Sequence, residues 1–204
     1  MKILLLLGLL AACAVGLDDG AMKIKVDGQD ETVYVVSAGS SHPNIIVTSN
    51  SVTMKGGSGV NFAKEQINDF EPTMFREFNL VGKRLSYTVD NSKVYCSCNS
   101  ALYLVSMPGY NSDQKPDPSQ AGTYYCDANK VAGNYCPEFD ISEANMYAMQ
   151  TTAHKCSTPR GKFYDWCDGA GCGKRVWDYN SNALCPQSHC TIDTTKAYRH
   201  HIDF

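Results

Sequence analysis

Short extended segments separated by turn-forming residues are the feature that most limits how this sequence can fold. Residues 84–89 alternate apolar and polar side chains, and residues 101–107 are almost continuously apolar. Alternation is typical of a strand exposed on one face, and a continuous apolar run is typical of a strand covered on both faces. Residues 108–123 contain three prolines and two glycines and predict a loop. The pattern therefore predicts an all-β protein, an antiparallel β-sandwich.

Other segments fit the same fold class. No amphipathic helix or internal repeat interrupts them. They comprise β-branched runs at 33–36 and 45–47, an acidic extended segment at 138–141, a cysteine-stapled loop region at 157–187 and one or two closing strands at 191–204.

Three carboxylates lie within the six residues Glu138–Glu143. On a strand, Glu138 and Asp140 share a face, whereas Glu143 is an odd number of residues from Glu138 and belongs to the opposite face. A β-bulge would absorb one residue and return Glu143 to the first face. Three converging carboxylates suit a retaining glycosidase, which needs one neutral and one charged carboxyl group. The alternative is a solvated acidic strand end without catalytic function.

Composition restricts the partners of the chain. The net charge of −3 over 204 residues argues against nucleic acid or an anionic membrane surface as the main partner. Only 19% of the residues are charged, while 12 tyrosines, 16 glycines and 10 cysteines are present. This mixture is typical of a secreted, loop-rich β protein that handles a neutral polar ligand.

The N-terminus predicts export. Lys2 precedes a short apolar run, residues 3–15, that ends in small residues. We interpret residues 1–16 as a signal peptide, cleaved after Ala14 or Gly16, and residues 17–204 as one mature domain. The alternative is a bacterial lipoprotein processing site at Leu10–Cys13. No later segment is long and apolar enough to span a membrane, so a secreted protein without a membrane partner is expected.

Several motifs carry a resemblance to a known family. Glu138–Asn145 resembles the Glu-X-Asp-X-X-Glu-Ala-Asn signature of glycoside hydrolase family 7, whose members are secreted cellulases that include cellobiohydrolases and endoglucanases. The resemblance extends from about residue 45 to the end of the chain. Its further motifs are Phe75–Gly82, Leu85–Asp90, Asn99–Met107, Tyr125–Asp127, His154–Cys156, Cys167–Cys172 and Ile192–Lys196.

The resemblance implies a concanavalin-like jelly roll and a role for each carboxylate. Glu138 would be the nucleophile, Glu143 the general acid/base, and Asp140 would hold Glu138 and adjust its ionisation. Family members need no metal or organic cofactor, so none is expected here.

Four further residues match the substrate cleft of the family. Asn99 and Tyr103 would line it beside the nucleophile, and Asp127 would contact a sugar. His154 would bind a sugar hydroxyl or buffer Glu143. The alternatives are that Tyr103 is a core residue with its hydroxyl bound to backbone and that His154 is structural.

Export favours disulfides, and nine cysteines remain after Cys13, so at least one lacks a partner within the chain. The resemblance implies the pairs Cys126–Cys136, Cys156–Cys185 and Cys167–Cys172. It pairs Cys96 and Cys190 with positions further along in the family, and Cys98 has no counterpart. The rival interpretation of residues 167–190, with His189, is a metal site.

Departures from the family pattern shape the expected function. The chain ends at Phe204, where the family domain continues, so it is expected to be an N-terminal part of that domain or a minimal variant that repacks or associates. Ser142 replaces the usual Trp, Asn180 and Ser188 replace an Arg and an Asp on the product side, and the loop between Cys126 and Cys136 is short. An open cleft that favours internal cuts is expected.

We therefore expect a secreted retaining hydrolase of β-1,4-glucosidic bonds in cellulose or related β-glucans, closer to an endoglucanase. One alternative is a weakly active or inactive glucan-binding pseudoenzyme. The other is a glucanase acting on β-1,3 or mixed-linkage glucan, because glycoside hydrolase family 16 uses a similar bulged carboxylate strand.

Overall fold

The structure is a computed structural model that describes residues 18–38 and 44–204. The expected signal peptide at residues 1–16 lies outside the described residues. The described residues form strands and turns, with a short 3-10 helix. None of their helices has the length and apolar character needed to cross a bilayer. The described residues divide into two compact units, one of those up to residue 70 together with 74–76 and the other of residues 71–73 and 77–204.

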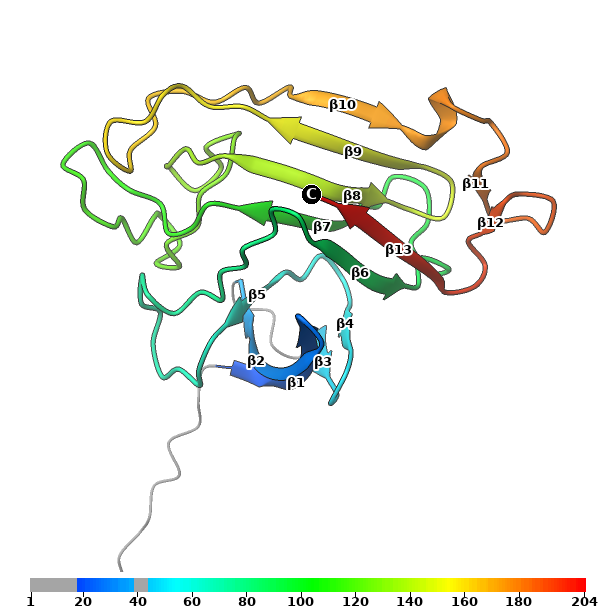
Figure 1. The fold of residues 1–204 in the computed structure, drawn as a ribbon, viewed down its shortest axis with the longest axis horizontal. Coiled ribbons are helices and arrows are strands. Elements are labelled where there is room, and N and C mark those ends of the chain that lie inside the picture. The colour runs from blue at the N-terminus through cyan, green and yellow to red at the C-terminus, as the bar shows by residue number, and fades with distance from the viewer. Residues whose placement is uncertain (1–17, 39–43) are drawn as a thin grey trace, which may run out of the picture. The chain divides into compact units, whose positions relative to one another are not determined.

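The first unit contains an antiparallel sheet in the order β1-β2-β5 and a β3-β4 hairpin (Figure 1). Its strands are β1 (Asp18–Val26), β2 (Gln29–Ser37), β3 (Ile45–Val47), β4 (Val52–Met54) and β5 (Val60–Ala63). β1 and β2 are joined by Asp27 and Gly28, which both have positive φ angles (50° and 83°). Two such residues between paired strands are typical of a tight type I′ hairpin, a turn that favours Asp-Gly. The core of this unit gathers Val36, Ala63, Ile67 and Met74.

The second unit carries the acidic segment. Its main sheet is antiparallel in the order β10-β9-β8-β7 (Figure 1). The strands are β7 (Ser100–Val105), β8 (Glu138–Ala144), β9 (Met149–His154) and β10 (Cys172–Arg175). The 3-10 helix η2 (Val176–Asp178) follows β10 directly. The acidic segment is therefore a central strand, flanked by a neighbour on each side.

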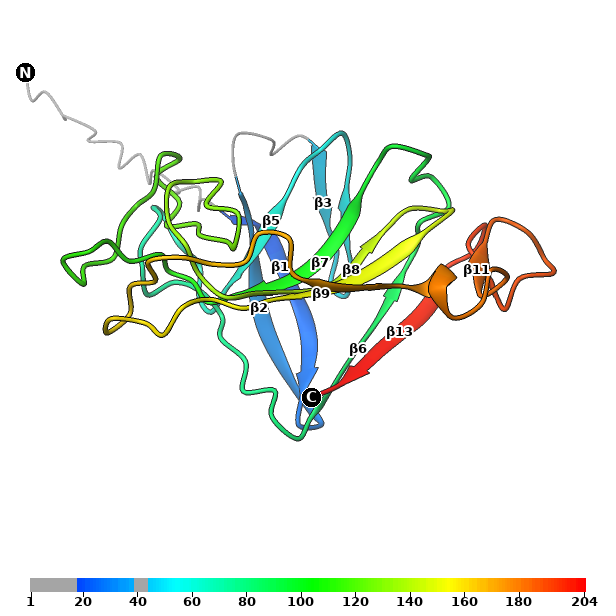
Figure 2. The same ribbon diagram turned by 90° about the horizontal axis from the view of Figure 1, so that it is seen from above.

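A second antiparallel pair in the same unit joins β6 (Arg84–Val89) to β13 (Tyr198–Asp203), two strands far apart in the sequence that run side by side (Figure 2). Phe139 of β8 meets Phe204 edge to face at 6.0 Å between ring centroids, and Ser142 interacts with the Tyr87 hydroxyl. These contacts pack the β6–β13 pair against one face of the main sheet. The other face is left for the carboxylates. A short parallel pair joins β11 (Leu184–Cys185) to β12 (Ile192–Asp193).

Three disulfides occur among the described residues. Cys126–Cys136 is present, as the resemblance implies. The implied pairs Cys156–Cys185 and Cys167–Cys172 are wrong, because Cys156 bonds Cys167 and Cys185 bonds Cys190. The placement of Cys190 with a more distant partner is wrong for the same reason.

The physical reason for the different pairing is the local backbone. Cys156 and Cys167 face each other in a β-bridge, with their Cα atoms 3.9 Å apart. A turn brings Cys190 back to Cys185, with 5.8 Å between the Cα atoms. Cys96, Cys98 and Cys172 are free and exposed.

Candidate functional site

A β-bulge interrupts the carboxylate strand, as the odd spacing predicts. Against β7, Asp140 lies opposite Tyr103, and Ser142 lies opposite the next residue, Leu102, so Ile141 has no partner there. Against β9, Asp140 lies opposite Thr152 and Glu143 lies opposite Gln150, which again leaves one extra residue on β8. Both neighbours therefore place the extra residue between Asp140 and Glu143.

The bulge places all three carboxylates on one face of the sheet. Glu138, Asp140 and Glu143 lie opposite Val105, Tyr103 and Ala101, which alternate on β7. Directly opposed residues of antiparallel strands share a face, so the three carboxylates share the face of Tyr103. The residues opposite on β9, which are His154, Thr152 and Gln150, also alternate and lie on that face.

Glu138 is held by the loop that the first disulfide closes. Its Oε2 accepts a hydrogen bond of 2.9 Å from the backbone N–H of Ala128. The neighbouring Asp127 is buried, and its Oδ1 accepts two N–H bonds of 3.0 Å from within the same loop. Cys126 and Cys136 are both buried and bonded to each other. The loop therefore presents a fixed hydrogen-bond donor to Glu138. Because Asp127 is buried, it acts on Glu138 through its charge and has little surface free to contact a sugar.

Asp140 and His154 form a buried pair behind Glu138. His154 Nε2 lies 2.9 Å from Asp140 Oδ2, and its Nδ1 lies 2.7 Å from the backbone oxygen of Asp168. The side chains of His154 and Asp140 are only 6% and 9% exposed. Both ring nitrogens are engaged within the chain. The structure thus places His154 on Asp140, where it orients that carboxylate, and not on Glu143.

The electrostatics follow from this packing. Burial raises the pKa of Glu138, and the charges of Asp140 and Asp127 raise it further, against the Ala128 N–H and His154, which lower it. Burial alone would lower the pKa of His154, but the Asp168 carbonyl and the Asp140 carboxylate outweigh it and raise that pKa. Glu138 is therefore a carboxyl group whose ionisation is set by its neighbours, as catalytic carboxyls often are.

Tyr103 lies on the face of the sheet that carries the carboxylates and is 37% exposed. Its hydroxyl meets the hydroxyl of Tyr125 at 3.2 Å, and not a backbone group. Burial raises the pKa of both phenols, and contact with Asp127 raises that of Tyr125 as well. The two tyrosines offer a polar edge beside Glu138 that a neutral hydroxylated ligand can meet.

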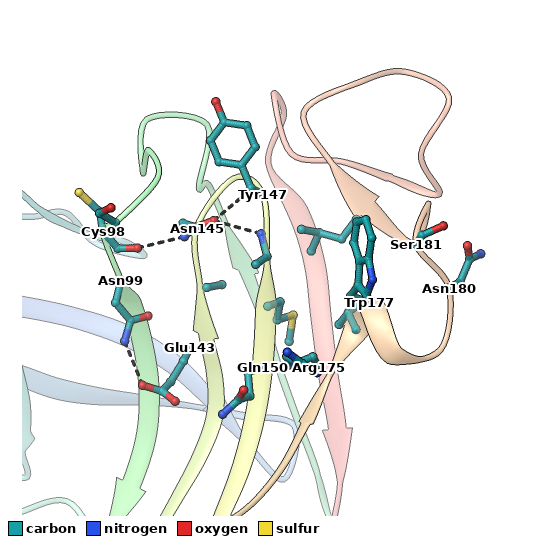
Figure 3. A pocket seen from close by; sticks show the side chains of 16 residues that line it. Cys98, Asn99, Glu143, Asn145, Tyr147, Gln150, Arg175, Trp177, Asn180 and Ser181 are labelled. Carbon is teal, nitrogen blue, oxygen red and sulfur yellow. Dashed lines mark hydrogen bonds between the residues drawn. The ribbon is translucent and has the colours of Figure 1, made fainter.

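Glu143 lies at the other end of the strand, where the surface opens into a groove of about 740 Å³. Asn99 Nδ2 donates a hydrogen bond of 3.0 Å to Glu143 Oε1, so these two predicted residues are together (Figure 3). Glu138 is not among the residues that line this groove. Polar and apolar side chains share the lining, which consists of Ser97, Cys98, Asn99, Glu143, Ala144, Asn145, Tyr147, Ala148, Met149, Gln150, Arg175, Val176, Trp177, Asn180, Ser181 and Leu184.

Trp177 and Arg175 are groove residues that sequence reasoning missed. Trp177 lies on η2 and is 66% exposed, on the side of the groove formed by β10 and η2 (Figure 3). Arg175 pairs with Asp178 at 3.1 Å, so its charge is balanced within the wall. An exposed tryptophan beside polar side chains is a suitable surface for a sugar ring. The sequence contains only two tryptophans, Trp166 and Trp177, and this scarcity is the one signal that could have marked Trp177 as a candidate sugar contact.

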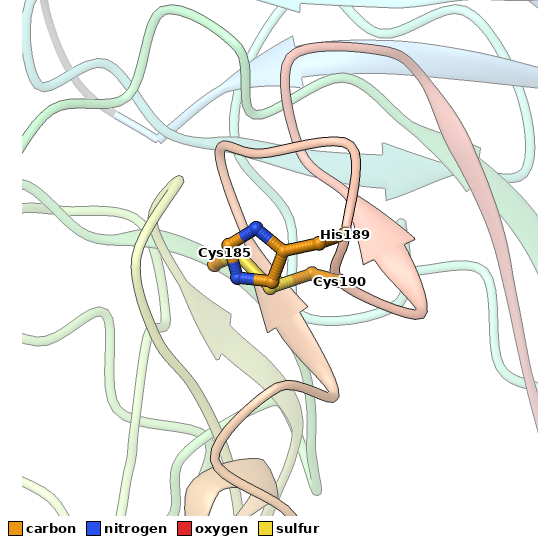
Figure 4. Close-up of side chains that lie close together, drawn as sticks. All are labelled: Cys185, His189 and Cys190. Atoms are coloured by element: carbon orange, nitrogen blue, oxygen red, sulfur yellow. A yellow bond between two sulfur atoms is a disulfide. The ribbon is translucent and has the colours of Figure 1, made fainter.

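The rival metal interpretation can be tested on one cluster. The ligand atoms of Cys185, His189 and Cys190 lie within 4.8 Å of one another (Figure 4). Cys185 and Cys190 are bonded to each other, however, so neither sulfur is a thiolate. A single exposed imidazole remains, which is too few ligands for a structural zinc site.

Comparison with known proteins identifies the family. The sequence profile described as glycosyl hydrolase family 7 matches residues 13–132, more than half of the chain. The chain belongs to glycosyl hydrolase family 7. This confirms the resemblance drawn from the motifs. The profile match ends before β8. The interpretation of the carboxylates in this family 7 chain therefore depends on the strand geometry and on matches to individual relatives.

Two curated relatives show the extent of the likeness. Exoglucanase GH7B of Limnoria quadripunctata is 28% identical over 212 residues, covering 86% of this chain and 45% of the relative. Fewer than 30 residues of this family 7 chain lie outside that match, so it includes Glu138–Glu143. Endoglucanase 1 of Pyricularia oryzae is 32% identical over 142 residues, covering 62% of this chain. The chain spans 45% and 31% of the lengths of these two relatives.

Solved structures support the fold. A structure described as endoglucanase I complexed with cellobiose matches with a TM-score of 0.65 at 21% identity, covering 90% of this chain and 65% of that one. A family 7 cellobiohydrolase from Daphnia pulex matches with a TM-score of 0.63 at 20% identity, covering 90% and 63%. The predicted all-β sandwich is confirmed for this family 7 chain.

Proposed function

We propose that this chain is the part of a secreted, retaining β-glucan hydrolase that carries its carboxylates, and that it cleaves β-1,4-glucosidic bonds. The observation that carries the proposal is the bulge in β8, which puts Glu138, Asp140 and Glu143 on one face of the sheet. Relatives named endoglucanase and exoglucanase support a cellulose-type substrate. Export is supported by the N-terminal apolar segment and by the disulfides.

In this proposal Glu138 attacks the anomeric carbon and Glu143 protonates the leaving oxygen. Water, activated by the ionised Glu143, then hydrolyses the glycosyl intermediate on Glu138. The N–H of Ala128 and the buried pair of Asp140 and His154 fix Glu138 and its electrostatic surroundings. Asn99 holds Glu143 at the mouth of the groove, which suits a group that must exchange a proton with the leaving sugar.

The sugar contacts of this proposal come from both ends of the strand. Tyr103 and Tyr125 offer hydroxyls beside Glu138, and Asp127 contributes charge there. Trp177 offers an exposed ring in the groove beside Glu143. The wall of that groove formed by β10 and η2 contains no buried residue. This exposure supports an open cleft, in which internal cuts are favoured over processive release.

Trapping the intermediate tests the nucleophile. A 2-fluoro-cellobioside with a good leaving group is incubated with the chain, and the labelled peptide is mapped by mass spectrometry. Label on Glu138, absent from Glu138→Gln, is the expected result. Label on any other carboxylate would overturn the assignment. Comparing reducing sugar released from carboxymethylcellulose and from laminarin separates β-1,4 from β-1,3 specificity.

A non-catalytic glucan-binding role is the second candidate. One observation favours it: Glu143 lines the groove, whereas Glu138 does not. Binding to insoluble cellulose without release of reducing sugar by the pure protein would support this role. Hydrolysis that Glu138→Gln abolishes would eliminate it.

A further inference from the structure

The turn at Asp168–Gly171 contacts the carboxylate cluster through the His154 side chain. The Asp168 carbonyl oxygen is 2.7 Å from His154 Nδ1, and the opposite ring nitrogen reaches Asp140 at 2.9 Å. The imidazole is thus clamped between the turn and the carboxylate strand.

The turn itself is tightly fixed. Its first residue, Asp168, donates its backbone N–H to the carbonyl of Lys155 at 2.8 Å. The Asp168 carboxylate accepts the N–H groups of Ala170 and Gly171, each at 3.2 Å. Cys167, immediately before it, is buried and bonded across the hairpin. These contacts hold the Asp168 carbonyl at a constant place relative to His154.

Gly171 lets this turn approach His154 closely. Its φ angle is +65°, in the region that favours glycine. A Cβ on Gly171 would lie 2.6 Å from Thr152 Cγ2 and 2.7 Å from His154 Nδ1. Thr152 is 2% exposed and His154 is 9% exposed, so neither side chain has space to move aside. A Cβ at 171 would therefore force the imidazole or the Thr152 side chain to shift.

We propose that Gly171 and the Asp168 carbonyl are positioning elements, which hold the His154 imidazole against Asp140 and so keep the Asp140 and Glu138 carboxylates arranged for glycosyl transfer. The inference rests on the proposed function of Glu138. The same arrangement keeps the imidazole near Glu138, where the charge of its protonated form lowers the Glu138 pKa against the effect of burial. Gly171 touches no substrate in this scheme and acts only through His154.

Gly171→Ala is the test, and two other glycines are matched controls. Gly161 and Gly82 have φ angles of +64° and +74°, so alanine at either carries a similar backbone cost. A Cβ on Gly161 meets only the end of the exposed Gln114 side chain, and a Cβ on Gly82 meets nothing within 4 Å. The difference between Gly171→Ala and these controls isolates the contact with His154 and Thr152.

Gly171→Ala is expected to lower kcat on cello-oligosaccharides about 10- to 100-fold below both controls, with KM changed by less than about twofold. In a His154→Ala background the same substitution is expected to change kcat by less than about twofold, because the displaced group is gone. An unchanged kcat in Gly171→Ala, or full additivity in that background, would overturn the proposal.

Thr152→Ser supplies a second background in case Gly171→Ala fails to fold. It removes Cγ2 and keeps the hydroxyl that accepts a bond from Gln150, so of the three atoms nearest to a Cβ at 171 only the two of His154 remain. The double variant Thr152→Ser/Gly171→Ala is expected to show the same loss of kcat relative to Thr152→Ser. Equal kcat for the two would contradict the proposal.

An NMR titration of His154 keeps this inference separate from the proposed function. In the full chain, Gly171→Ala is expected to lower the His154 pKa toward 6.5, while Gly161→Ala leaves it raised, as in the unsubstituted chain. If the unsubstituted chain hydrolyses nothing, the proposed function fails but the titration still reports on His154. A His154 pKa unaffected by Gly171→Ala would refute the positioning role.

Discussion

The two ends of the carboxylate strand differ sharply, although the bulge between them spans only two residues. At the Glu138 end, a disulfide-closed loop, a buried imidazole and two tyrosines surround the carboxyl group. At the Glu143 end, one amide holds the carboxylate beside a groove with an exposed tryptophan. At one end the strand thus holds its carboxyl group in a fixed electrostatic environment, and at the other it leaves space for a ligand.

This division fits the two tasks of a double displacement. A nucleophile must be held in one ionisation state and orientation, so a rigid, partly desolvated setting suits it. An acid/base group must exchange protons with the leaving sugar and with water, so an accessible setting suits it. Four experiments test whether the two ends really differ in this way.

Glu143→Gln should give the largest contrast between the two ends. Loss of the proton donor is expected to slow hydrolysis of cello-oligosaccharides about 10²- to 10⁴-fold. Aryl glycosides with acidic leaving groups need little protonation and should lose far less in the first step. Glu138→Gln, at the closed end, should slow both substrates alike, because both need the nucleophile. Steady-state kinetics on the two substrates check this, and an equal loss for both in Glu143→Gln would contradict the division.

Removing the disulfide of the closed end should be the second-largest effect. Cys126→Ala/Cys136→Ala is expected to lower the free energy of unfolding by about 2–4 kcal/mol, because the bond closes the loop that holds Glu138. The control at the open end, Cys96→Ser/Cys98→Ser, changes exposed, unbonded cysteines and should cost less than about 0.5 kcal/mol. Urea unfolding measures both, and equal losses would show that the two ends are equally rigid.

Trp177→Ala tests the open end by ligand binding. Loss of the exposed ring is expected to weaken cellobiose binding by up to about tenfold. Because the chain has two tryptophans, Trp166→Phe leaves Trp177 as the only indole fluorophore. Its fluorescence should change on titration with cellobiose in a Glu138→Gln background. Under the same conditions the matched variant Trp177→Phe, which keeps Trp166, should remain silent, and a response there would move the ligand to another surface.

Asp127→Asn should give the smallest shift and tests the closed end. The charge of Asp127 raises the Glu138 pKa, so its removal lowers that pKa. Glu138 must be ionised to attack, so the acidic limb of kcat/KM should move to lower pH, by less than about one unit. Asparagine keeps the oxygen that accepts the two loop N–H bonds, so the loop should persist. A limb that moves to higher pH would contradict the assignment of Glu138 to that limb.

Much of the second unit could be predicted from local patterns. Residues 84–89 alternate and form β6 with the predicted limits, because a strand half covered by the sheet behind it needs alternation. The bulge at Ile141 could be predicted because an odd spacing between carboxylates has few structural solutions. The apolar segment at 101–107 overlaps β7, but the residues of β7 are only partly buried and Tyr103 is exposed, so the expectation of a strand covered on both faces is wrong.

Strands that direct polar side chains to the site were harder to recognise from the sequence. β9 was missed because its site-facing residues are polar, as Gln150, Thr152 and His154 show, so the usual apolar alternation is absent. The β1–β2 hairpin gave a weak signal, although Asp27-Gly28 is a good marker of a tight turn. The parts of the site that come from β10 and η2 could not be predicted, because they depend on which strand pairs with β9.

The disulfide errors have a similar origin. Cysteine partners are set by which distant segments face each other, and sequence spacing does not determine this. Cys167 pairs with Cys156 because a β-bridge places them opposite each other, and Cys172 is left as a free thiol at the start of β10. The close approach of Gly171 to His154 depends on the same pairing of Cys156 with Cys167 and could not be predicted from the sequence either.

The unpaired residue Ile141 also bears on how this strand tolerates a change of length. Without it, the segment would read Glu-Phe-Asp-Ser-Glu, and a regular ladder would still direct every acidic group to the same side. Loss of this one codon would thus remove a curve in the backbone while sparing the direction of the acids. Deleting Phe139 instead would reverse Glu138 relative to the other two. The direction of the acids should therefore survive the loss of Ile141, which costs a fully buried side chain, but not the loss of Phe139 two residues away.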